Sequence, residues 1–203
     1  MHWRRQWQPT PVFLPEESQG WGALAALFHA VTPRTAGFNT VDLNRLTSAG
    51  RAMTVVLMLV GGAPGSTAGG VKTTTVAVLL SNAVAVIRRR KDPRLFNRRI
   101  DEDTVKSAST LMMLYLLLAL LGAFIISAKE GLAFETCLFE TASAIGTVGL
   151  SLGITPTLGY LSRGVLMGLM FYGRAGALTL LFAAIGSTEP QVAEYPLGRI
   201  NVG

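Results

Sequence analysis

Apolar residues gather along this chain into runs of different lengths, separated by short stretches rich in glycine, proline or charge. The longest run, Leu111–Ile126, predicts with its flanks a bilayer-spanning helix over residues 104–128, because about 20 apolar residues cross the hydrocarbon layer. A second long run predicts a spanning helix over residues 160–185, interrupted at Gly173–Gly176. The pattern therefore predicts an all-α membrane protein.

Two shorter apolar runs, over residues 21–32 and 132–145, predict helices that enter the membrane without crossing it. Pro33 helps to end the first, because the residue before a proline is pushed out of the helical region. A segment of small and polar residues follows each run, over residues 34–39 and 146–151. Each half of the chain is therefore predicted to hold a short helix, an extended segment and a longer helix.

A glycine-rich loop, Gly61–Thr75, interrupts what would otherwise be one helix over residues 46–90. Neither flank, Met53–Val60 or Val76–Ile87, is long enough to span a bilayer alone. Irregular backbone cannot face lipid, because its amide and carbonyl groups would lack hydrogen-bond partners. We therefore expect this loop to line a transport pathway inside the membrane.

The two halves of the chain match at a nearly fixed offset, which indicates an internal repeat. The offset is 112 residues for two of the matched stretches and one residue less for the other. Repeats of this kind place an ion or substrate site at the interface between the repeats. The matches are Leu27-Phe28 with Leu138-Phe139, Thr35–Asn39 with Thr147–Ser151, and Met58–Gly61 with Met170–Gly173.

Charge supports the membrane interpretation. The chain of 203 residues has a net charge of +6, is half hydrophobic and has a positive mean hydropathy. Seven of its 18 Lys and Arg residues lie between Arg88 and Arg99, between two apolar segments. We interpret this run as a cytoplasmic loop under the positive-inside rule. A nucleic-acid site is disfavoured, because Phe96 is the only aromatic residue in the run.

The extended segments have the composition of an ion filter, in which backbone carbonyl oxygens replace the water around potassium and glycine allows unusual dihedral angles. Thr147-Val148-Gly149 begins like the Thr-Val-Gly-Tyr-Gly filter, with Leu150 and Ser151 in place of its Tyr and Gly. The same position in the first half carries Thr35-Ala36-Gly37. The predicted filter residues are Thr35, Ala36, Gly37, Phe38, Asn39, Thr147, Val148, Gly149, Leu150 and Ser151.

Arg174 is a charged residue inside an apolar run, and such residues normally face a polar cavity. The repeat aligns Arg174 with Gly62, so we expect Arg174 at the depth of the glycine loop, across the pore. Its charge would repel a permeating cation, so loop and arginine would form a gate. A structural arginine bound to helix-end carbonyls is the alternative. The predicted gate residues are Gly61, Gly62, Gly65, Ser66, Thr67, Gly69, Gly70, Lys72 and Arg174.

Nucleotide binding by the glycine loop is disfavoured. A phosphate-binding loop requires Gly-x4-Gly-Lys followed by Ser or Thr. Gly65 and Gly70 have the required spacing, but Val71 stands before Lys72, and no typical strand precedes the loop. Lys72 is instead expected in the polar loop near the inner vestibule.

The remaining chemically active residues predict neither an enzyme nor a metal site. His2 and His29 are isolated, and the single Cys137 lies in an apolar stretch, where it is expected to be buried and inert. Glu135 and Glu140 could add negative potential at an outer mouth, or they could be solvated or capping groups. No nucleophile with a base, and no pair of carboxylates, is arranged for catalysis.

Four motifs, in this order, resemble the Trk/Ktr/HKT superfamily of potassium transporters. They are Val31–Asn39, Gly61–Thr75, Thr141–Ser151 and Gly173–Gly176, and the tail Tyr195–Gly203 is similar to the end of a bacterial Ktr-type pore subunit. In that superfamily four covalently linked repeats surround one pore, each with two spanning helices and a pore loop. The resemblance implies that residues 21–100 are the third repeat without its first spanning helix, and residues 101–203 the fourth, after a lead-in over residues 1–20.

The resemblance also implies a function and partners. It implies potassium uptake across the plasma membrane, the inner membrane of a bacterium, by a multi-pass protein with Gly37 and Gly149 as filter glycines. Such subunits form homodimers, bind a cytosolic nucleotide-binding regulatory subunit, and often use sodium as a coupling ion. No cofactor is expected in the chain. Two repeats cannot close a four-sided pore, so we expect the C-terminal half of a transporter, either a fragment or half of a split protein, that needs the missing N-terminal repeats. A non-conducting membrane interaction subunit and a membrane-bound nucleotide-hydrolysing enzyme are the alternatives.

Overall fold

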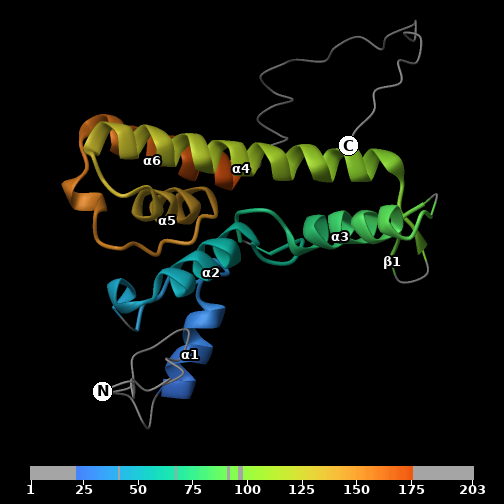
Figure 1. The fold of residues 1–203 in the computed structure, drawn as a ribbon, viewed down its shortest axis with the longest axis horizontal. Coiled ribbons are helices and arrows are strands. Elements are labelled where there is room, and N and C mark those ends of the chain that lie inside the picture. Colours follow the sequence, from blue (N-terminus) through green and yellow to red (C-terminus); the bar gives the residue numbers. More distant parts are fainter. Residues whose placement is uncertain (1–21, 41, 67, 91, 96–97, 176–203) are drawn as a thin grey trace, which may run out of the picture.

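The computed structural model describes residues 22–40, 42–66, 68–90, 92–95 and 98–175. Helices dominate this part of the chain, as the apolar runs predict (Figure 1). The short 3-10 helices are η1 (Leu43–Arg45) and η2 (Thr155–Thr157). The α-helices are α1 (Gly22–Val31), α2 (Ser48–Leu59), α3 (Thr73–Ile87), α4 (Glu102–Glu130), α5 (Phe134–Ile145) and α6 (Tyr160–Ala175).

Within the described residues, α4 is the one helix long and apolar enough, by length and composition, to cross a bilayer. Glu102 and Asp103 stand in its first turn, where the positive end of the helix dipole favours acidic side chains. The helix ends where Gly131 takes a left-handed φ of 68°, a conformation that costs glycine little. Met113 and Phe124 are more than half exposed, so α4 presents an apolar surface outside the fold.

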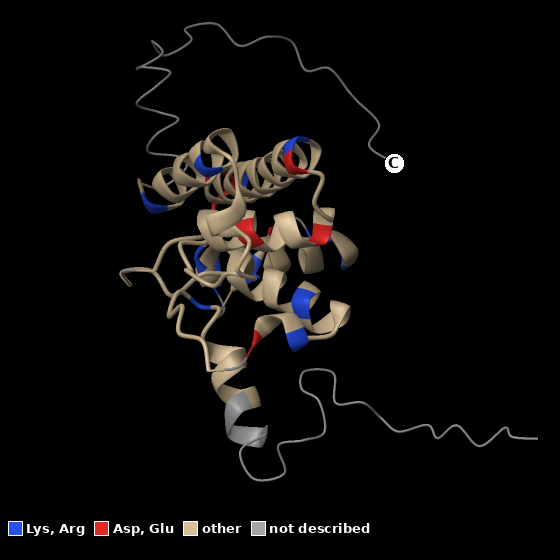
Figure 2. Ribbon diagram, turned by 90° about the vertical axis from the view of Figure 1, so that its left-hand side faces the viewer, with Lys and Arg blue, Asp and Glu red and all other residues tan. Residues whose placement is uncertain are grey.

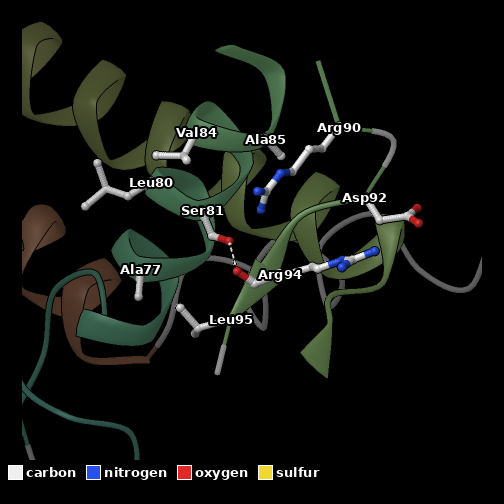
Figure 3. A pocket seen from close by; sticks show the side chains of 9 residues that line it. All are labelled: Ala77, Leu80, Ser81, Val84, Ala85, Arg90, Asp92, Arg94 and Leu95. Carbon is white, nitrogen blue, oxygen red and sulfur yellow. Dashed lines mark hydrogen bonds between the residues drawn. The ribbon is translucent and has the colours of Figure 1, made fainter. Parts of the chain in front are cut away.

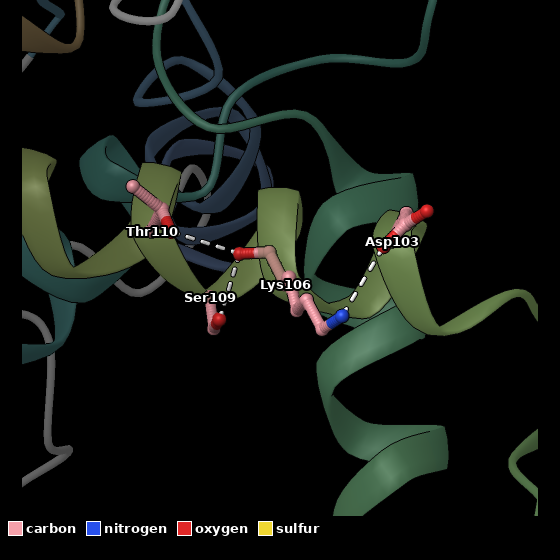
Figure 4. Close-up of polar contacts among 4 residues, drawn as sticks. All are labelled: Asp103, Lys106, Ser109 and Thr110. Carbon is pink, nitrogen blue, oxygen red and sulfur yellow. Dashed lines mark hydrogen bonds and ion pairs between the residues drawn. The ribbon is translucent and has the colours of Figure 1, made fainter. Parts of the chain in front are cut away.

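A polar cluster occupies the start of α4 (Figure 4). Lys106 Nζ lies 3.2 Å from Asp103 Oδ1, and the hydroxyls of Ser109 and Thr110 donate to Lys106 O at 2.8 and 2.9 Å. A hydroxyl that bonds to the preceding turn of its own helix is already satisfied without water. The polar part of α4 therefore ends at Thr110, and the apolar run begins at Leu111.

α5 lies at the centre of the C-terminal part, packed against α4, α6 and α2 (Figure 1). Every residue from Phe139 to Ile145 is buried. Gly122 lets α4 approach closely, because a Cβ there would lie 2.8 Å from Leu169 and 3.2 Å from Thr141. Glu130, the last residue of α4, accepts hydrogen bonds from Ser162 Oγ (2.6 Å) and Gly159 N–H (3.0 Å). These bonds connect the C-terminal end of α4 to the N-terminal end of α6.

The helix predicted over residues 46–90 is broken into α2 and α3, with the glycine loop between them. An isolated parallel bridge joins Val60 to Val71 at the base of this loop. Gly61 N–H donates to Val71 O at 2.8 Å, and Val71 N–H donates to Leu59 O at 3.3 Å. These bonds satisfy backbone groups that would find no partner in lipid.

One element was not predicted from the sequence. A small antiparallel hairpin, β1 (Arg94–Leu95) with β2 (Arg98–Arg99), lies in the basic run that was expected to be only a loop. Strands of two residues are too short to show the alternation by which a strand is predicted. The all-α prediction is therefore wrong in this detail, and the fold is mostly helical.

The internal repeat appears as matching positions of the helices. α1 and α5, η1 and η2, and α2 and α6 each begin 112 residues apart. We call residues 22–59 the first repeat and residues 134–175 the second repeat. At this spacing Leu27 corresponds to Phe139, so its pairing with Leu138 is wrong by one residue, because the adjacent Leu and Phe fit either register.

Several sequence expectations lie outside the described residues. α6 is described to Ala175, so the expected continuation to residue 185 and the tail over 186–203 are not. The lead-in over residues 1–20, with His2, is also outside the described part of the chain, as is Thr67 in the glycine loop.

Candidate functional site

The two predicted filters, residues 34–39 and 146–151, lie against each other. A Cβ added to Gly37 would overlap the carbonyl oxygen of Val148, and it would lie 3.3 Å from Val148 C and 3.6 Å from Gly149 Cα. Glycine is therefore the residue that fits at position 37 without moving its neighbour. Two segments far apart in the sequence touch through their backbones.

The two predicted filters also share an unusual backbone pattern. Thr35 and Thr147 have φ values of 64° and 53°, and Gly37 and Gly149 have φ values of 72° and 91°. A β-branched residue with positive φ is strained, because its side chain crowds the backbone. The same two positions in each repeat are thus left-handed, two residues apart.

The second predicted filter is held from behind by Glu140 of α5. Glu140 is buried, with 5% of the residue's surface exposed, and its carboxylate accepts three hydrogen bonds. The donors are Ser151 Oγ at 2.7 Å, Leu152 N–H at 2.9 Å and Thr155 Oγ1 at 3.0 Å. Of the possibilities left open for Glu140, the structure excludes a solvated group, and its hydrogen bonds fix the chain beyond the predicted filter.

The first predicted filter is held differently. Thr32, at the end of α1, donates its hydroxyl to Phe38 O at 2.6 Å, and its carbonyl accepts from the N–H groups of Ala36 and Gly37 at 3.1 and 3.2 Å. The sequence analysis did not single out Thr32. The signal that could have found it was a threonine directly before Pro33, just ahead of the predicted segment.

The glycine loop lies directly beside the start of the second predicted filter. Gly69 N–H donates to Thr147 Oγ1 at 3.1 Å, and a Cβ at Gly70 would lie 3.5 Å from Gly146 Cα. Within the loop, a Cβ at Gly61 would overlap Gly69 O. The close packing of loop on filter thus depends on residues without side chains.

The hydrogen bonds of Ser66 and Lys72 lie within the glycine loop itself. Gly65, with φ 81°, has open space around it and lies in a turn that Ser66 stabilises by donating its hydroxyl to Ala63 O at 2.6 Å. Lys72 Nζ donates to Ala68 O. The lysine is therefore bound to its own loop, a position that does not resemble that of a phosphate-binding lysine.

Arg174 lies in the last turn of α6 and lines a cavity of about 410 Å³ beside the second predicted filter. The same cavity is lined by Glu140, Thr147, Gly149 and Ser151. A Cβ at the neighbouring Gly173 would overlap Ile145 O, which brings this turn of α6 against the end of α5. Arg174 and the glycine loop thus border the same filter segment.

The remaining candidates have structural surroundings. Arg51 of α2 pairs with Glu135 of α5 at 3.4 Å, and His29 Nε2 lies 3.3 Å from Thr54 Oγ1. Cys137 is buried, as predicted. In the described ranges, no three His, Cys, Asp or Glu side chains are grouped as metal ligands would be. Figure 2 shows charged residues as scattered positions on a mostly uncharged ribbon. Glu140 and Arg174 are the charged residues among those that line the cavity beside the second predicted filter.

Comparison with known proteins gives the family. Residues 14–192 match the TrkH family, whose description is cation transport protein. The chain belongs to this family. The resemblance to Trk/Ktr-type transporters is thereby confirmed, and the family is one of transporters rather than of enzymes.

Individual relatives agree with this assignment. The chain is 37% identical over 179 residues to the Ktr system potassium uptake protein B of Bacillus subtilis, covering 88% of this chain and 40% of that protein. It is 37% identical over 172 residues to the potassium/sodium uptake protein NtpJ of Enterococcus hirae, covering 83% of this chain and 38% of that protein. The chain thus spans two fifths or less of the length of these relatives.

A solved structure shares the fold. The potassium transporter TrkH from Vibrio parahaemolyticus matches with a TM-score of 0.66 at 21% identity, covering 78% of this chain and 36% of that chain. The helices and their arrangement therefore follow the plan of that structure.

Proposed function

We propose that this chain supplies two adjacent walls of a potassium uptake pathway. The contact between Gly37 and Val148, together with the matching left-handed residues of both segments, is the observation that carries the proposal. The family is one of cation transport proteins, and the two relatives above are named for potassium and for potassium/sodium uptake. Potassium is therefore the proposed cargo, with sodium as a proposed coupling ion.

The backbone pattern supports an ion filter for a geometric reason. In an extended strand, successive residues point to opposite sides. Left-handed residues at Thr35 and Gly37, and at Thr147 and Gly149, interrupt this alternation and can turn successive carbonyl oxygens to one side. A cation that loses its hydration shell needs several such carbonyl oxygens around it at once. Two segments in contact would supply two sides of that coordination shell.

The gate in this proposal is the glycine loop together with Arg174. The loop touches Thr147 through Gly69, and Arg174 lines the cavity that borders Thr147 and Gly149. A fixed positive charge beside a cation pathway raises the energy of an ion there. Because the loop is packed through glycines, a small displacement would open or close the space next to the filter.

The proposed setting is the plasma membrane of a bacterium, with several crossings. α4 supplies one helix of spanning length, and the basic residues from Arg88 to Arg99 are placed on the cytoplasmic side. Four filter segments are needed to enclose an ion, so we propose that two further repeats complete the pore. A homodimer and a cytosolic nucleotide-binding regulatory subunit complete the proposed assembly.

Uptake by a potassium-starved bacterial strain tests the filter. Gly37→Ser and Gly149→Ser, introduced separately into the transporter that carries this chain, are expected to reduce rubidium or potassium uptake at least tenfold. A side chain at either site meets left-handed backbone, and at Gly37 also the Val148 carbonyl. Gly168→Ser, at a helical glycine with open space around it, is the matched control. Normal uptake by both filter variants, at equal amounts of protein in the membrane, would contradict the proposal.

A further inference from the structure

We propose that the cleft between α3 and the β1–β2 hairpin binds an anionic phospholipid. The cleft has a volume of about 400 Å³ and lies at the end of α3, next to the basic run (Figure 3). It is separate from the predicted filters and the gate. The inference rests on the membrane orientation proposed above, but it does not depend on the ion pathway.

One side of the cleft is an apolar strip along α3. Ala77, Leu80, Val84 and Ala85 line it, and Leu95 of β1 closes it from the hairpin side (Figure 3). The strip from Ala77 to Ala85 is about 12 Å long at the rise of an α-helix. Leu80 and Val84 are 63% and 47% exposed, so no described element covers the strip. Such a surface fits the upper part of an acyl chain.

The hairpin is held against this strip by its own contacts. Ser81 Oγ donates to Arg94 O at 2.8 Å, and Ile100 N–H donates to Pro93 O at 3.0 Å across the base of the hairpin. One hydrogen bond between α3 and β1 therefore joins the walls of the cleft, and the cleft does not depend on an occupant to bring them together.

The C-terminal turn of α3 directs an arginine over the cleft. Arg89 is left-handed, with φ 50°, and Arg90 N–H donates to Ala85 O at 2.8 Å while Arg89 N–H donates to Val86 O at 3.0 Å. This is the Schellman arrangement, which reverses the chain at a helix end. Figure 3 shows the Arg90 side chain reaching back toward α3, with its guanidinium group over the cleft.

The charge at the rim favours an anion. Six arginines and one acid, Asp92, are described between residues 88 and 99. Asp92 also lines the cleft, but its Oδ1 lies 3.3 Å from Arg99 Nε, so its charge is compensated. Arg90 and Arg94 are exposed and line the cleft, and Figure 3 shows the Arg94 side chain directed away from α3, on the side of Asp92. The planar fork of a guanidinium group matches the oxygens of a phosphate.

The combination of features distinguishes a phospholipid from other anions. A phosphate ion would use the arginines but not the apolar strip, and a soluble partner would not need a strip that continues along an apolar helix. Basic clefts at the cytoplasmic ends of spanning helices bind anionic headgroups, each arginine near the surface contributing about 1 kcal/mol. Apolar residues lie along α3, and the arginines follow at its C-terminal end. This order matches the order of the acyl chain and the phosphate group in a phospholipid.

Native mass spectrometry of the detergent-solubilised transporter that carries this chain tests the inference without any measurement of ion flux. The probes are phosphatidylglycerol, phosphatidylcholine with the same acyl chains, and glycerol 3-phosphate. Phosphatidylglycerol is expected to bind about tenfold more tightly than phosphatidylcholine. The double variant R90Q/R94Q is expected to weaken phosphatidylglycerol binding about thirtyfold, since two arginines that line the cleft lose their charge. Ala77→Phe, which fills the space along the apolar strip, is expected to weaken the binding of both phosphatidylglycerol and phosphatidylcholine.

The matched control is R88Q/R98Q, which removes the same charge from exposed arginines that do not line the cleft. It is expected to change phosphatidylglycerol binding less than threefold. Equal weakening by the two double variants, equal binding of the two lipids, or displacement of lipid by glycerol 3-phosphate would each overturn the inference. The single variants R90Q and R94Q replace the double variant if its elution from a sizing column differs from that of the parent protein.

Discussion

The first and second repeats use the same backbone pattern but hold it in place by different means. In the second repeat α5 is buried among α4, α6 and α2, and a carboxylate fixes the chain beyond the filter segment. In the first repeat α1 is largely exposed where its side chains are described, and Thr32 holds the segment through one hydroxyl and its own carbonyl. No described helix stands beside α1 as α4 stands beside α5.

The comparison separates what the backbone pattern requires from what its surroundings supply. Left-handed residues at corresponding positions occur in both repeats, so this pattern needs neither Glu140 nor a buried helix. Position 28, which corresponds to Glu140, is Phe28, and it is 39% exposed. Each repeat is therefore stabilised by its own contacts. A substitution at Glu140 or Thr32 should affect its own repeat more than the other.

Removing the carboxylate of the second repeat should have the largest effect. Glu140→Ala deletes the acceptor of three hydrogen bonds and leaves the buried Leu152 N–H without its partner. A loss of about 3 kcal/mol in the free energy of unfolding is expected, because hydrogen bonds to charged groups contribute more than neutral ones. Thermal unfolding in detergent measures the stability, and uptake of rubidium measures the filter.

Glu135→Ala is the control for this change, since Glu135 lies on the same helix but is 46% exposed and makes one ion pair, with Arg51. It should cost less than about 1 kcal/mol. If Glu140→Ala and Glu135→Ala have equal effects on stability and uptake, the support assigned to Glu140 is wrong.

The corresponding change in the first repeat should be smaller. Thr32→Val keeps the shape of a buried side chain but removes the hydroxyl that donates to Phe38 O. The expected loss is about 1 kcal/mol, the net contribution of one neutral hydrogen bond, with a measurable fall in uptake. Thr32→Ser keeps the hydroxyl and should retain uptake. If Thr32→Ser and Thr32→Val reduce uptake equally, the hydroxyl is not what holds the first predicted filter.

The sequence predicted most of the helices for simple physical reasons. The apolar run at Leu111–Ile126 is long enough to require a helix, and Gly131 supplies the left-handed end that such a helix needs. The glycines from Gly61 to Gly70 marked the break between α2 and α3. Local composition determines these features, so one sequence was enough to find them.

Features that depend on contacts between residues far apart in the sequence could not be predicted from local composition. No role could be chosen for Glu140 from the sequence, because its donors Ser151 and Thr155 lie on a segment that folds back over α5. The hairpin at Arg94–Leu95 forms through its contact with α3. The packing of Gly69 on Thr147 joins residues 78 positions apart. Each of these requires the fold to be known first.

A polar link between helices distinguishes the first repeat further. Thr54 donates its hydroxyl to Gly50 O at 2.8 Å, so its oxygen accepts from His29 Nε2 at 3.3 Å, which connects α1 to α2. In the second repeat the corresponding residues are Thr141 and the buried, apolar Leu166. Thr54→Val is expected to destabilise the protein by about 1 kcal/mol, because the buried histidine N–H loses its partner.

The control for Thr54→Val is Thr54→Ser, which retains the hydroxyl and should lower the unfolding temperature less. Uptake by Thr54→Val should fall less than uptake by Thr32→Val, since Thr54 does not touch the predicted filter. Equal unfolding temperatures for Thr54→Val and the parent protein would show that the link between α1 and α2 contributes nothing.

The smallest effect on stability is expected at Arg174, where the two repeats differ in charge. The same position gives the clearest test of the proposed gate. Gly62 of the glycine loop corresponds to Arg174, which is exposed at the end of α6 and borders the cavity beside the second predicted filter. Arg174→Ala should change the free energy of unfolding by less than about 0.5 kcal/mol, as is usual for exposed side chains. The rate of potassium uptake should rise several-fold, because a positive charge next to the pathway is lost.

Arg163→Ala provides the control, because Arg163 is exposed on the first turn of α6, donates to Pro156 O and does not line this cavity. Its uptake should match that of the parent protein. If Arg174→Ala leaves uptake unchanged, Arg174 is a structural residue at a helix end, and any gating would have to come from the glycine loop alone. Gly69→Ala distinguishes the two, since its Cβ would overlap Thr147 Oγ1 and push the loop away from the filter without altering any charge.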